Sequence, residues 1–391
     1  MDPRKNPYAP GAGTPPPELA GREALIEKAS IALDRIKAGR TARSLILYGL
    51  RGVGKTVLLK GISREADAKG FAIVWIEAPE DQSLPGLLIP ALRSALYKLG
   101  RGVALKAKMI AALGALASFA RGLKIEYQGI ELSADYKPEP GIADSGDLER
   151  DLADLLQTAG EAAKEQGTAL VLFIDELQYV EVKELAALIT ALHRANQNEL
   201  PVALIAAGLP QLVGNAGKAK SYAERLFEFV EIGKLGDAAA KDALCKPAAK
   251  EQVEFHPKAI AEILRETQGY PYFLQEWGKH CWDLAQLSPI AEEDAKHATR
   301  SAIAGLDASF FRVRFDRLTP VEKRYVRAMA ELGPGPHRSG DIADKLHKKV
   351  TTCAPTRSAL IIKGMIYSPA HGDTAFTVPL FDGFMKRIMP L

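Results

Sequence analysis

Short, almost continuously apolar runs alternate with amphipathic segments from the start of the chain to about residue 235. Such runs are typical of strands buried on both faces of a parallel sheet. The predicted strands are residues 44–48, 72–76, 169–174, 202–207 and 230–232. Between them, apolar residues recur at helical spacing, and the predicted helices are residues 24–37, 57–69, 84–99, 148–164 and 182–196. This alternation predicts βαβ units, and therefore an α/β fold with a parallel sheet.

The alternation is interrupted at about residues 100–146, which we interpret as an insertion. An Ala- and Leu-rich helix at 103–120 is followed by alternating residues at 123–134, which predict a β-hairpin about Gln128-Gly129. Inserted segments often carry function, but a plain packing role is equally compatible with this composition.

Beyond residue 236 the pattern becomes helical. Helices predicted at 238–246, 257–267, 272–287 and 291–306 form an α-helical lid. Helices at 320–332, 338–347 and 351–364, followed by two short strands within 366–379, have the order of a winged helix-turn-helix. The predicted domains are a Pro-rich N-terminal arm (1–17), the α/β domain (18–235), the helical lid (236–310) and the winged-helix domain (311–391).

The first predicted strand runs into a glycine-rich turn with the spacing G-x-x-x-x-G-K-T, the Walker A motif or P-loop. Its glycines let successive backbone N–H groups face one anion, and the following helix adds its positive N-terminal end. Lys55 is expected to reach the β- and γ-phosphates of ATP, and the Thr56 hydroxyl to hold Mg²⁺. The flanking strand and helix argue against a chance match. The predicted ATP-binding residues here are Gly49, Leu50, Arg51, Gly52, Val53, Gly54, Lys55, Thr56 and Val57.

Two adjacent carboxylates, Asp175 and Glu176, follow the apolar strand at 169–174, as in a Walker B motif. Parallel α/β sheets bind ligands at this edge, beyond the carboxyl ends of the strands. We predict that Asp175 joins Thr56 in the Mg²⁺ shell, and that Glu176 orients or deprotonates the attacking water. A solvated turn or a helix cap is the alternative. The predicted cofactors are therefore ATP and Mg²⁺, and the predicted activity is ATP hydrolysis to ADP and phosphate.

Arg225 lies between the fourth and fifth predicted strands. Phosphoryl transfer needs positive charge at the γ-phosphate, often from an arginine of a neighbouring subunit. Arg225 is thus a candidate catalytic residue, with Lys55 and Glu176, and implies a homo-oligomer or a partner protein. The alternative is a surface arginine paired with Glu224 or Glu228.

Four stretches stand in the order seen in AAA+ ATPases: residues 19–23, the Walker A run, residues 173–178 and Glu224-Arg225-Leu226-Phe227. The chain is similar to the initiator (ORC/CDC6-like) group of that superfamily, and to its bacterial relatives. The resemblance implies a P-loop NTPase (AAA+) domain, a helical lid and a C-terminal winged helix over nearly the whole chain. It also implies four residues near the adenine, namely Leu19, Ala20, Gly21 and Arg22.

Two places depart from the pattern of that group. The fourth strand ends in Ala206-Ala207-Gly208 and offers no polar sensor side chain. The lid has Gly269-Tyr270-Pro271 where a sensor arginine is common. This Gly-x-Pro resembles the STAND group of signalling ATPases, which implies that Pro271 meets the nucleotide and that hydrolysis is slow. Otherwise, Pro271 is simply a helix starter.

The predicted winged helix carries polar and basic residues at the front of its recognition helix. Such side chains are suited to the phosphates of duplex DNA. A protein-docking role is the alternative, because Ile361 and Ile362 mark a buried face. The candidate DNA-binding residues are Lys348, Lys349, Thr351, Thr352 and Arg357.

Composition adds little to this picture. A net charge of +3 is too small to indicate nucleic acid, and three widely spaced cysteines fit a reducing compartment without structural zinc. The most apolar window, 109–120, is too short to span a bilayer, so we expect a cytoplasmic protein without a membrane partner.

The leading hypothesis is an ATP-binding, slowly hydrolysing ATPase whose nucleotide state controls engagement of DNA or a partner. One alternative is a STAND-like signalling switch without DNA binding. Another is an ATPase subunit of a mobile-element or defence system.

Overall fold

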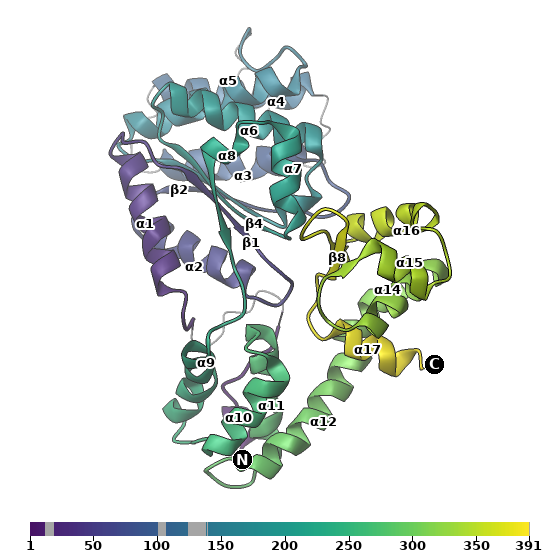
Figure 1. Cartoon of the computed structure of the whole chain (residues 1–391). Coiled ribbons are helices and arrows are strands. Elements are labelled where there is room, and N and C mark those ends of the chain that lie inside the picture. The colour runs from purple at the N-terminus through teal and green to yellow at the C-terminus, as the bar shows by residue number, and fades with distance from the viewer. Residues whose placement is uncertain (12–18, 101–106, 124–137, 139, 391) are drawn as a thin grey trace.

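The computed structural model describes residues 1–11, 19–100, 107–123, 138 and 140–390. Figure 1 shows three parts, which we name by their residues. The α/β region comprises residues 19–235, the helical region comprises helices α9–α12, and the C-terminal region runs from α13 to α17. The predicted hairpin at 123–134 lies, apart from Leu123, outside the described residues.

A five-stranded sheet with the order β2-β3-β4-β1-β5 forms the centre of the α/β region, and all its pairs are parallel. The strands are β1 (Ser44–Tyr48), β2 (Ala72–Glu77), β3 (Leu170–Asp175), β4 (Val202–Gly208) and β5 (Phe227–Glu231). The predicted parallel α/β sheet is therefore confirmed. The last strand was predicted at 230–232, but the edge strand β5 begins three residues earlier, where Phe227 pairs with Ser44 of β1, and ends at Glu231.

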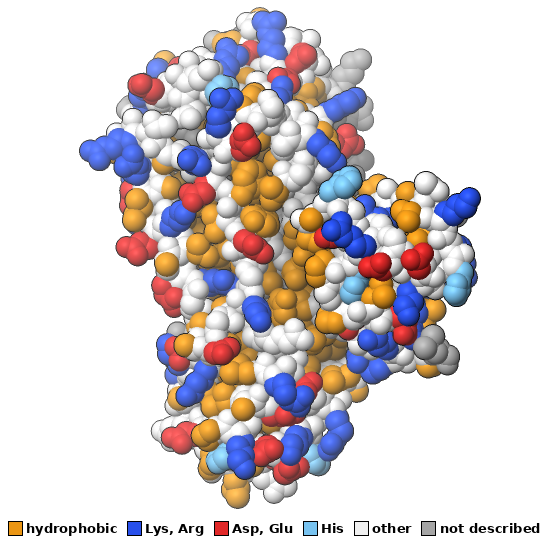
Figure 2. All heavy atoms as spheres, in the orientation of Figure 1, with side chains coloured by type: hydrophobic (Ala, Val, Ile, Leu, Met, Phe, Trp, Pro, Cys, Tyr) orange, Lys and Arg blue, Asp and Glu red, His pale blue; other side chains and the backbone are white. Residues whose placement is uncertain are grey.

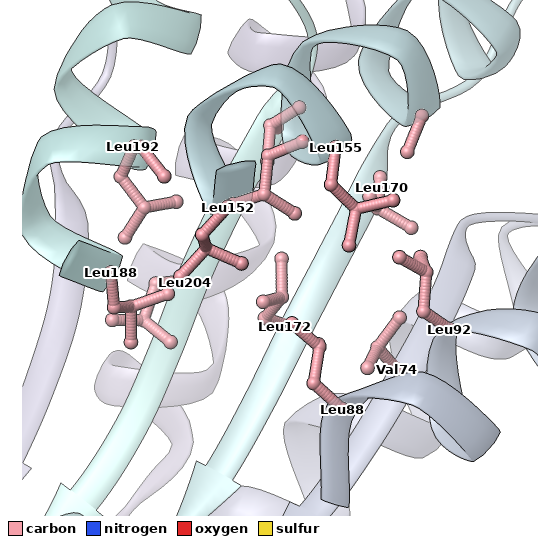
Figure 3. Close-up of a cluster of buried hydrophobic side chains, with 14 of the residues drawn as sticks. Val74, Leu88, Leu92, Leu152, Leu155, Leu170, Leu172, Leu188, Leu192 and Leu204 are labelled. Carbon is pink, nitrogen blue, oxygen red and sulfur yellow. The ribbon is translucent and has the colours of Figure 1, made fainter. Parts of the chain in front are cut away.

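Helices cover both faces of this sheet. They are α1 (Glu23–Lys37), α2 (Lys55–Ala68), α3 (Leu84–Leu99), α4 (Ala107–Gly122), α5 (Leu148–Glu165), α6 (Val182–Gln197), α7 (Gln211–Ala219) and α8 (Ala223–Leu226). Leucines of α3, α5 and α6 pack on β2, β3 and β4 (Figure 3), and side chains of α1 and α2 pack on the opposite face. Helix α4, predicted as part of an insertion, is buried in the same core. We did not predict α7, in which Gly214 and Gly217 are poor helix formers.

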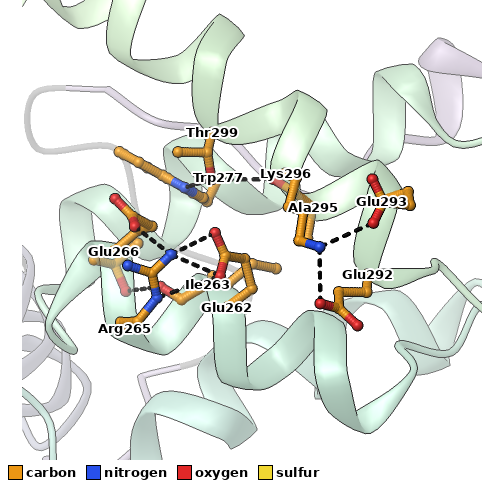
Figure 4. A network of polar contacts seen from close by, with 11 residues as sticks. Glu262, Ile263, Arg265, Glu266, Trp277, Glu292, Glu293, Ala295, Lys296 and Thr299 are labelled. Carbon is orange, nitrogen blue, oxygen red and sulfur yellow. Dashed lines mark hydrogen bonds and ion pairs between the residues drawn. The ribbon is translucent and has the colours of Figure 1, made fainter.

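The helical region contains α9 (Asp237–Lys250), α10 (Pro257–Thr267), α11 (Pro271–Leu284) and α12 (Glu292–Ala308). Helix α11 ends three residues before its predicted end at 287. Figure 4 shows how Trp277 ties α11 to α12: its Nε1 donates to the Thr299 Oγ1 at 2.9 Å. The ion pairs of Lys296 and Arg265 in the same view are exposed, so they contribute little to stability.

The N-terminal arm is docked on α11. Its short 3-10 helix η1 (Pro3–Lys5) is followed by extended chain, and the Trp282 Nε1 donates to the Asp2 carbonyl at 2.9 Å. Tyr8 is buried against Gly278, where a Cβ atom would lie 2.6 Å from the tyrosine ring. Residue 278 must therefore be glycine for the arm to pack this closely.

The C-terminal region contains the three predicted helices and the predicted pair of short strands, together with elements that we did not predict. The helices are α13 (Phe310–Asp316), α14 (Pro320–Leu332), α15 (Ser339–Lys345), α16 (Val350–Ile362) and α17 (Phe381–Ile388). The antiparallel sheet has the order β6-β8-β7, with β6 (His337–Arg338), β7 (Ile366–Tyr367) and β8 (Asp373–Phe376). The additions are helices α13 and α17 and the strand β6, whose Arg338 was predicted to begin a helix. In the described part of the chain, no helix is long and apolar enough to cross a membrane.

The helical and C-terminal regions share one hydrophobic core. Phe311 of α13 lies 6.4 Å from Phe273 of α11 and stacks on Phe384 of α17 at 5.4 Å, between ring centroids. Helix α12 leads from one region to the other (Figure 1). The two regions are therefore packed together as one body, and they meet the α/β region at a separate junction.

Candidate nucleotide site

A cavity of about 620 Å³ lies where the α/β region, the helical region, the C-terminal region and the N-terminal arm meet. This volume is within the range of small-molecule sites. Most predicted ATP-binding residues line it, together with the predicted catalytic glutamate: Leu19, Ala20, Arg22, Arg51, Gly52, Val53, Gly54, Lys55, Thr56, Val57, Pro271 and Glu176. Gly21, Gly49, Leu50 and Asp175 adjoin the cavity without lining it.

The remaining lining residues come from parts of the chain that carry no motif. The arm contributes Ala9, Pro10 and Gly11, and the α/β region contributes Lys60, Glu77 and Leu235. The helical region contributes Ala243, Tyr272 and Gln275, and the segment at the start of the C-terminal region contributes Ser309, Phe310, Val313 and Arg314. Sequence reasoning missed them because only the tertiary fold brings them to the P-loop.

The P-loop holds its lysine in a buried position. Lys55 Nζ donates to the Gly49 carbonyl at 3.0 Å and to the Leu50 carbonyl at 2.9 Å. Burial lowers the pKa of Lys55 to about 8, so a phosphate beside it would favour the charged ammonium. Gly49 is required for steric reasons, because a Cβ there would lie 2.1 Å from the Ile232 carbonyl oxygen.

Asp175 and Thr56 meet beside this lysine. The Asp175 side chain is 2% exposed at the end of β3, and it accepts a hydrogen bond from the Thr56 hydroxyl. Burial is the main cause of its raised pKa. A hydroxyl and a carboxylate are the oxygen ligands that Mg²⁺ prefers, and this ion usually completes its shell with water and substrate phosphates. The predicted pair thus fits Mg²⁺.

Glu176 is held by two neighbouring side chains. Its backbone has a left-handed φ of 53°, and its carboxylate accepts a hydrogen bond from the Gln178 amide and lies 3.9 Å from Arg51 Nη1. Gln178 Oε1 in turn accepts from the Leu209 N–H at 2.9 Å. Gly208 leaves room for the Gln178 side chain, since a Cβ atom at residue 208 would lie 2.6 Å from Gln178 Oε1. Gln178 therefore supplies a polar group at the end of β4, where the strand itself has none.

The C-terminal region contacts the P-loop directly. The Arg51 backbone N–H donates to the Thr377 carbonyl at 2.8 Å, and Arg51 Nη2 donates to the Tyr179 hydroxyl at 2.7 Å. From the other side, the half-buried Arg314 stacks on Phe310, 4.0 Å from the ring centroid. Burial, with the nearby Arg51 charge, lowers the pKa of Arg314 to about 10. Arg51 and Arg314 thus join Arg22, Lys55 and Lys60 in lining the cavity, and this excess of positive side chains suits an anion.

Arg225 lies away from this cavity. It is exposed on α8 just before β5, whose first residue pairs with Ser44 at the start of β1. The P-loop follows the opposite end of β1, roughly 16 Å away at 3.3 Å per strand residue. Arg225 is therefore too far to reach the nucleotide of its own chain, and its predicted catalytic role requires a second chain.

If Arg225 acts on the γ-phosphate of a neighbouring subunit, as predicted, Arg225→Ala should lower ATP turnover at least tenfold without weakening ATP binding. Mixing Arg225→Ala with Glu176→Gln protein should partly restore turnover, measured as phosphate release. The exposed Arg150→Ala serves as the control. Absence of rescue in the mixture would contradict a role between subunits.

The candidate DNA-binding residues divide into two groups. Lys348, Lys349, Thr351 and Thr352 are exposed around the start of α16. The Arg357 guanidinium instead donates to the Thr374 hydroxyl and the Asp373 carbonyl, both at 2.8 Å, and to the Ser368 hydroxyl at 2.9 Å. Arg357 thus holds β8 on α16.

Comparisons with known proteins give two family matches. Residues 18–205 match the family described as the AAA ATPase domain, and residues 308–385 match a domain of unknown function (DUF8462). No similar sequence was found among curated proteins.

Several solved structures are similar to this chain in fold. The Walker-type ATPase of Pyrococcus abyssi is 17% identical, with a TM-score of 0.61, and the alignment covers 95% of this chain and 97% of that one. The Orc1 protein of Aeropyrum pernix, solved in complex with DNA, is 15% identical, with a TM-score of 0.48 and coverage of 95% and 94%. The RuvB Holliday junction branch migration motor of Thermotoga maritima is 17% identical, with a TM-score of 0.44 and coverage of 91% and 92%. The family match over residues 18–205 and the parallel five-stranded sheet together support a P-loop ATPase domain of the AAA+ type in this chain.

Proposed function

We propose that the chain binds Mg·ATP in this cavity, hydrolyses it slowly, and uses the bound nucleotide to fix its C-terminal region against the P-loop. The observation that carries the proposal is the hydrogen bond from the Arg51 N–H to the Thr377 carbonyl. A nucleotide at the P-loop lies beside this contact, so binding and release act on it directly.

In the proposed reaction, Lys55 binds the β- and γ-phosphates. Thr56 and Asp175 would hold Mg²⁺, which would supply positive charge to the phosphates. Glu176 orients the attacking water and takes its proton. The pairing of Glu176 with Gln178 and Arg51 competes with that role. Turnover is therefore slow unless the contact with Arg51 changes.

The docked arrangement depends on contacts across the junction with the α/β region. Arg317 forms an ion pair with Glu80 at 2.6 Å, and the Tyr272 N–H donates to the Gly52 carbonyl at 3.1 Å. Gly364 faces Leu209, where a Cβ atom would lie 3.0 Å from the leucine side chain. Arg51 and Arg314 repel each other across the cavity, and this repulsion disfavours docking. An anion between the two guanidinium groups offsets the repulsion. Bound ATP therefore favours docking, and more strongly than ADP.

We expect Arg314→Ala to weaken ATP binding about 10- to 100-fold and ADP binding less, because charge-assisted hydrogen bonds to a phosphate contribute about 1.5–3 kcal/mol. Titration calorimetry with each nucleotide measures the effect, and Arg314→Lys should recover part of it. Arg312→Ala is the matched control, since Arg312 is exposed on the same helix. Equal losses for ATP and ADP would contradict a position near the γ-phosphate.

We propose that nucleotide-dependent docking of the C-terminal region controls the availability of one surface, the start of α16. Helices α14–α16 with the sheet β6-β8-β7 have the order expected for a winged helix, and this supports a role in binding duplex DNA. A protein partner is the second candidate. It is favoured by the engagement of Arg357 with β8, by the exposed Val350 and Ile362, and by the mixture of acidic and basic side chains on the C-terminal region in Figure 2.

A mobility-shift titration with duplex DNA separates these candidates. If DNA is the partner, the double substitution Lys348→Ala with Lys349→Ala should weaken binding similarly for all DNA sequences. It should also reduce the slope of log affinity against log salt concentration by the amount expected for the loss of about two phosphate contacts. Lys183→Ala with Lys218→Ala, on the α/β region, is the control. No shift in ATP or ADP would reject DNA and favour the protein partner.

We also propose that the chain is related to the initiator-type ATPases and that its lid contacts the nucleotide as in the STAND group. Pro271 starts α11 and lines the cavity, which supports a Gly-x-Pro contact with the nucleotide. The close packing of the C-terminal region on the P-loop supports a switch more than a fast motor.

A further inference from the structure

The described part of the N-terminal arm is anchored to two helices, α9 and α11. The Asn6 amide donates to the Asp283 carboxylate at 2.8 Å, and the Asn6 Oδ1 accepts from the Tyr8 N–H at 3.0 Å. The Tyr8 ring is buried against Gly278 of α11, and its hydroxyl donates to the Leu244 carbonyl of α9. These contacts fix the position of the residues that follow Tyr8 in the chain.

The next three residues of the arm form part of the cavity wall. Ala9, Pro10 and Gly11 all line the nucleotide cavity. Ala9 and Gly11 are exposed and Pro10 is half-buried, so none of the three is enclosed by protein. The pyrrolidine ring of Pro10 also restricts the backbone at this point. A ligand in the cavity can therefore contact an arm segment that is already held in place.

The arm meets the cavity at a distance from the phosphate-binding loop. At the start of α11, the Tyr272 N–H donates to the Gly52 carbonyl of the P-loop, whereas the arm packs on Gly278. At about 1.5 Å per residue, Gly278 lies about 9 Å further along the helix than Tyr272. Several apolar residues line the cavity and share the hydrophobic cluster of Tyr8, namely Ala20, Leu235 and Ala243. Apolar walls suit the nucleoside of a nucleotide better than its phosphates.

We propose that the N-terminal arm is part of the nucleotide site: residues 9–11 cover the nucleoside of bound ATP or ADP, and Tyr8 is the positioning residue that holds them there. The inference rests on the proposed function, because it requires a nucleotide whose phosphates lie at the P-loop. It adds how the chain retains that nucleotide. The contacts between arm and nucleoside are lost on release, so the arm slows dissociation. ATP and ADP have the same nucleoside, and the arm therefore retains both alike.

The test is the release of tritium-labelled ADP, and of the non-hydrolysable ATP analogue AMP-PNP, from the full chain during a chase with unlabelled nucleotide. Tyr8→Ala should raise both dissociation rates at least about tenfold without lowering the association rates. Gly278→Ala should do the same, because its Cβ atom displaces the Tyr8 ring, while alanine favours the helix over glycine. The double variant should release nucleotide no faster than the faster single variant, since both changes free the same arm.

Two variants serve as matched controls. Arg4→Ala changes an exposed arm residue whose side chain pairs with Asp2. Gly305→Ala adds a Cβ atom to another glycine of the helical region, in α12, where the nearest atom lies 3.8 Å away. Both should release nucleotide at the native rate. Inorganic tripolyphosphate, which lacks a nucleoside, should compete for the P-loop equally well in the native chain and in Tyr8→Ala.

Several results would overturn the assignment. Native release rates in both Tyr8→Ala and Gly278→Ala would remove the arm from the site. Faster release of AMP-PNP alone, or weaker competition by tripolyphosphate in Tyr8→Ala, would place the arm at the phosphates. A lowered association rate with native dissociation would mean that the substitutions only damage the helical region. Failure of the proposed function looks different, since the native chain would then retain neither nucleotide.

Discussion

A Lys55→Ala variant is expected to lose ATP binding, with an affinity at least 100-fold below that of the native chain. Lys55 Nζ is buried beside the Gly49 and Leu50 carbonyls, at the point where the β- and γ-phosphates would lie. Removing the ammonium leaves that phosphate charge without its closest partner, a loss of about 3 kcal/mol or more. Titration calorimetry with Mg·ATP measures the change.

The fold should survive this substitution, because it removes a buried charge that burial already disfavours. An unchanged or higher melting temperature without nucleotide would show this. Lys183→Ala, an exposed lysine on α6, controls for the loss of one positive charge. ATP binding of native strength in the Lys55→Ala protein would place the nucleotide elsewhere.

Glu176→Gln should bind Mg·ATP about as tightly as the native chain but hydrolyse it 100-fold or more slowly. The amide keeps the size of the side chain and its contact with Gln178, yet it does not accept the proton of the attacking water. Loss of a positioned general base commonly costs a factor of 10² to 10⁴ in rate. Phosphate release under single-turnover conditions measures the chemical step apart from product release.

Glu181→Gln is the control for this variant, because Glu181 is an exposed carboxylate nearby, just before α6. It should hydrolyse ATP at the native rate. Normal hydrolysis by Glu176→Gln would remove Glu176 from the proposed reaction. Weak ATP binding by that variant would instead assign Glu176 a role in holding the nucleotide.

The elements with a clear hydrophobic pattern, either a continuous apolar run or an apolar helix face, were predictable from the sequence. The strands β1 to β4 are nearly continuous apolar runs, and α5 and α6 carry clear apolar faces, so one pattern determines both their type and their approximate position. The P-loop and the Asp175-Glu176 pair were found because their function depends on local spacing. Their relative placement then followed from the rule that parallel strands end at one edge of the sheet.

The rest of the site depends on long-range packing. Arg314 and Gln275 lie on helices whose sequences show only ordinary amphipathic spacing, and nothing local indicates that they face the P-loop. The packing of Tyr8 on Gly278 was also not predictable, because the Pro-rich composition of the arm indicates only an extended chain. The absence of a polar side chain at the end of β4 was visible in the sequence, but its replacement by Gln178 was not.

In the proposed function, bound nucleotide fixes the C-terminal region against the α/β region. The most direct test is amide hydrogen exchange at this junction, in peptides that cover α7 and the turn at residues 363–365. In the Glu176→Gln protein, we predict the slowest exchange with Mg·ATP, intermediate exchange with Mg·ADP and the fastest without nucleotide. The additional Arg314→Ala substitution should reduce these differences even at saturating nucleotide. Equal exchange in all three states of the Glu176→Gln protein, with ATP shown to be bound, would mean that the nucleotide does not fix the C-terminal region.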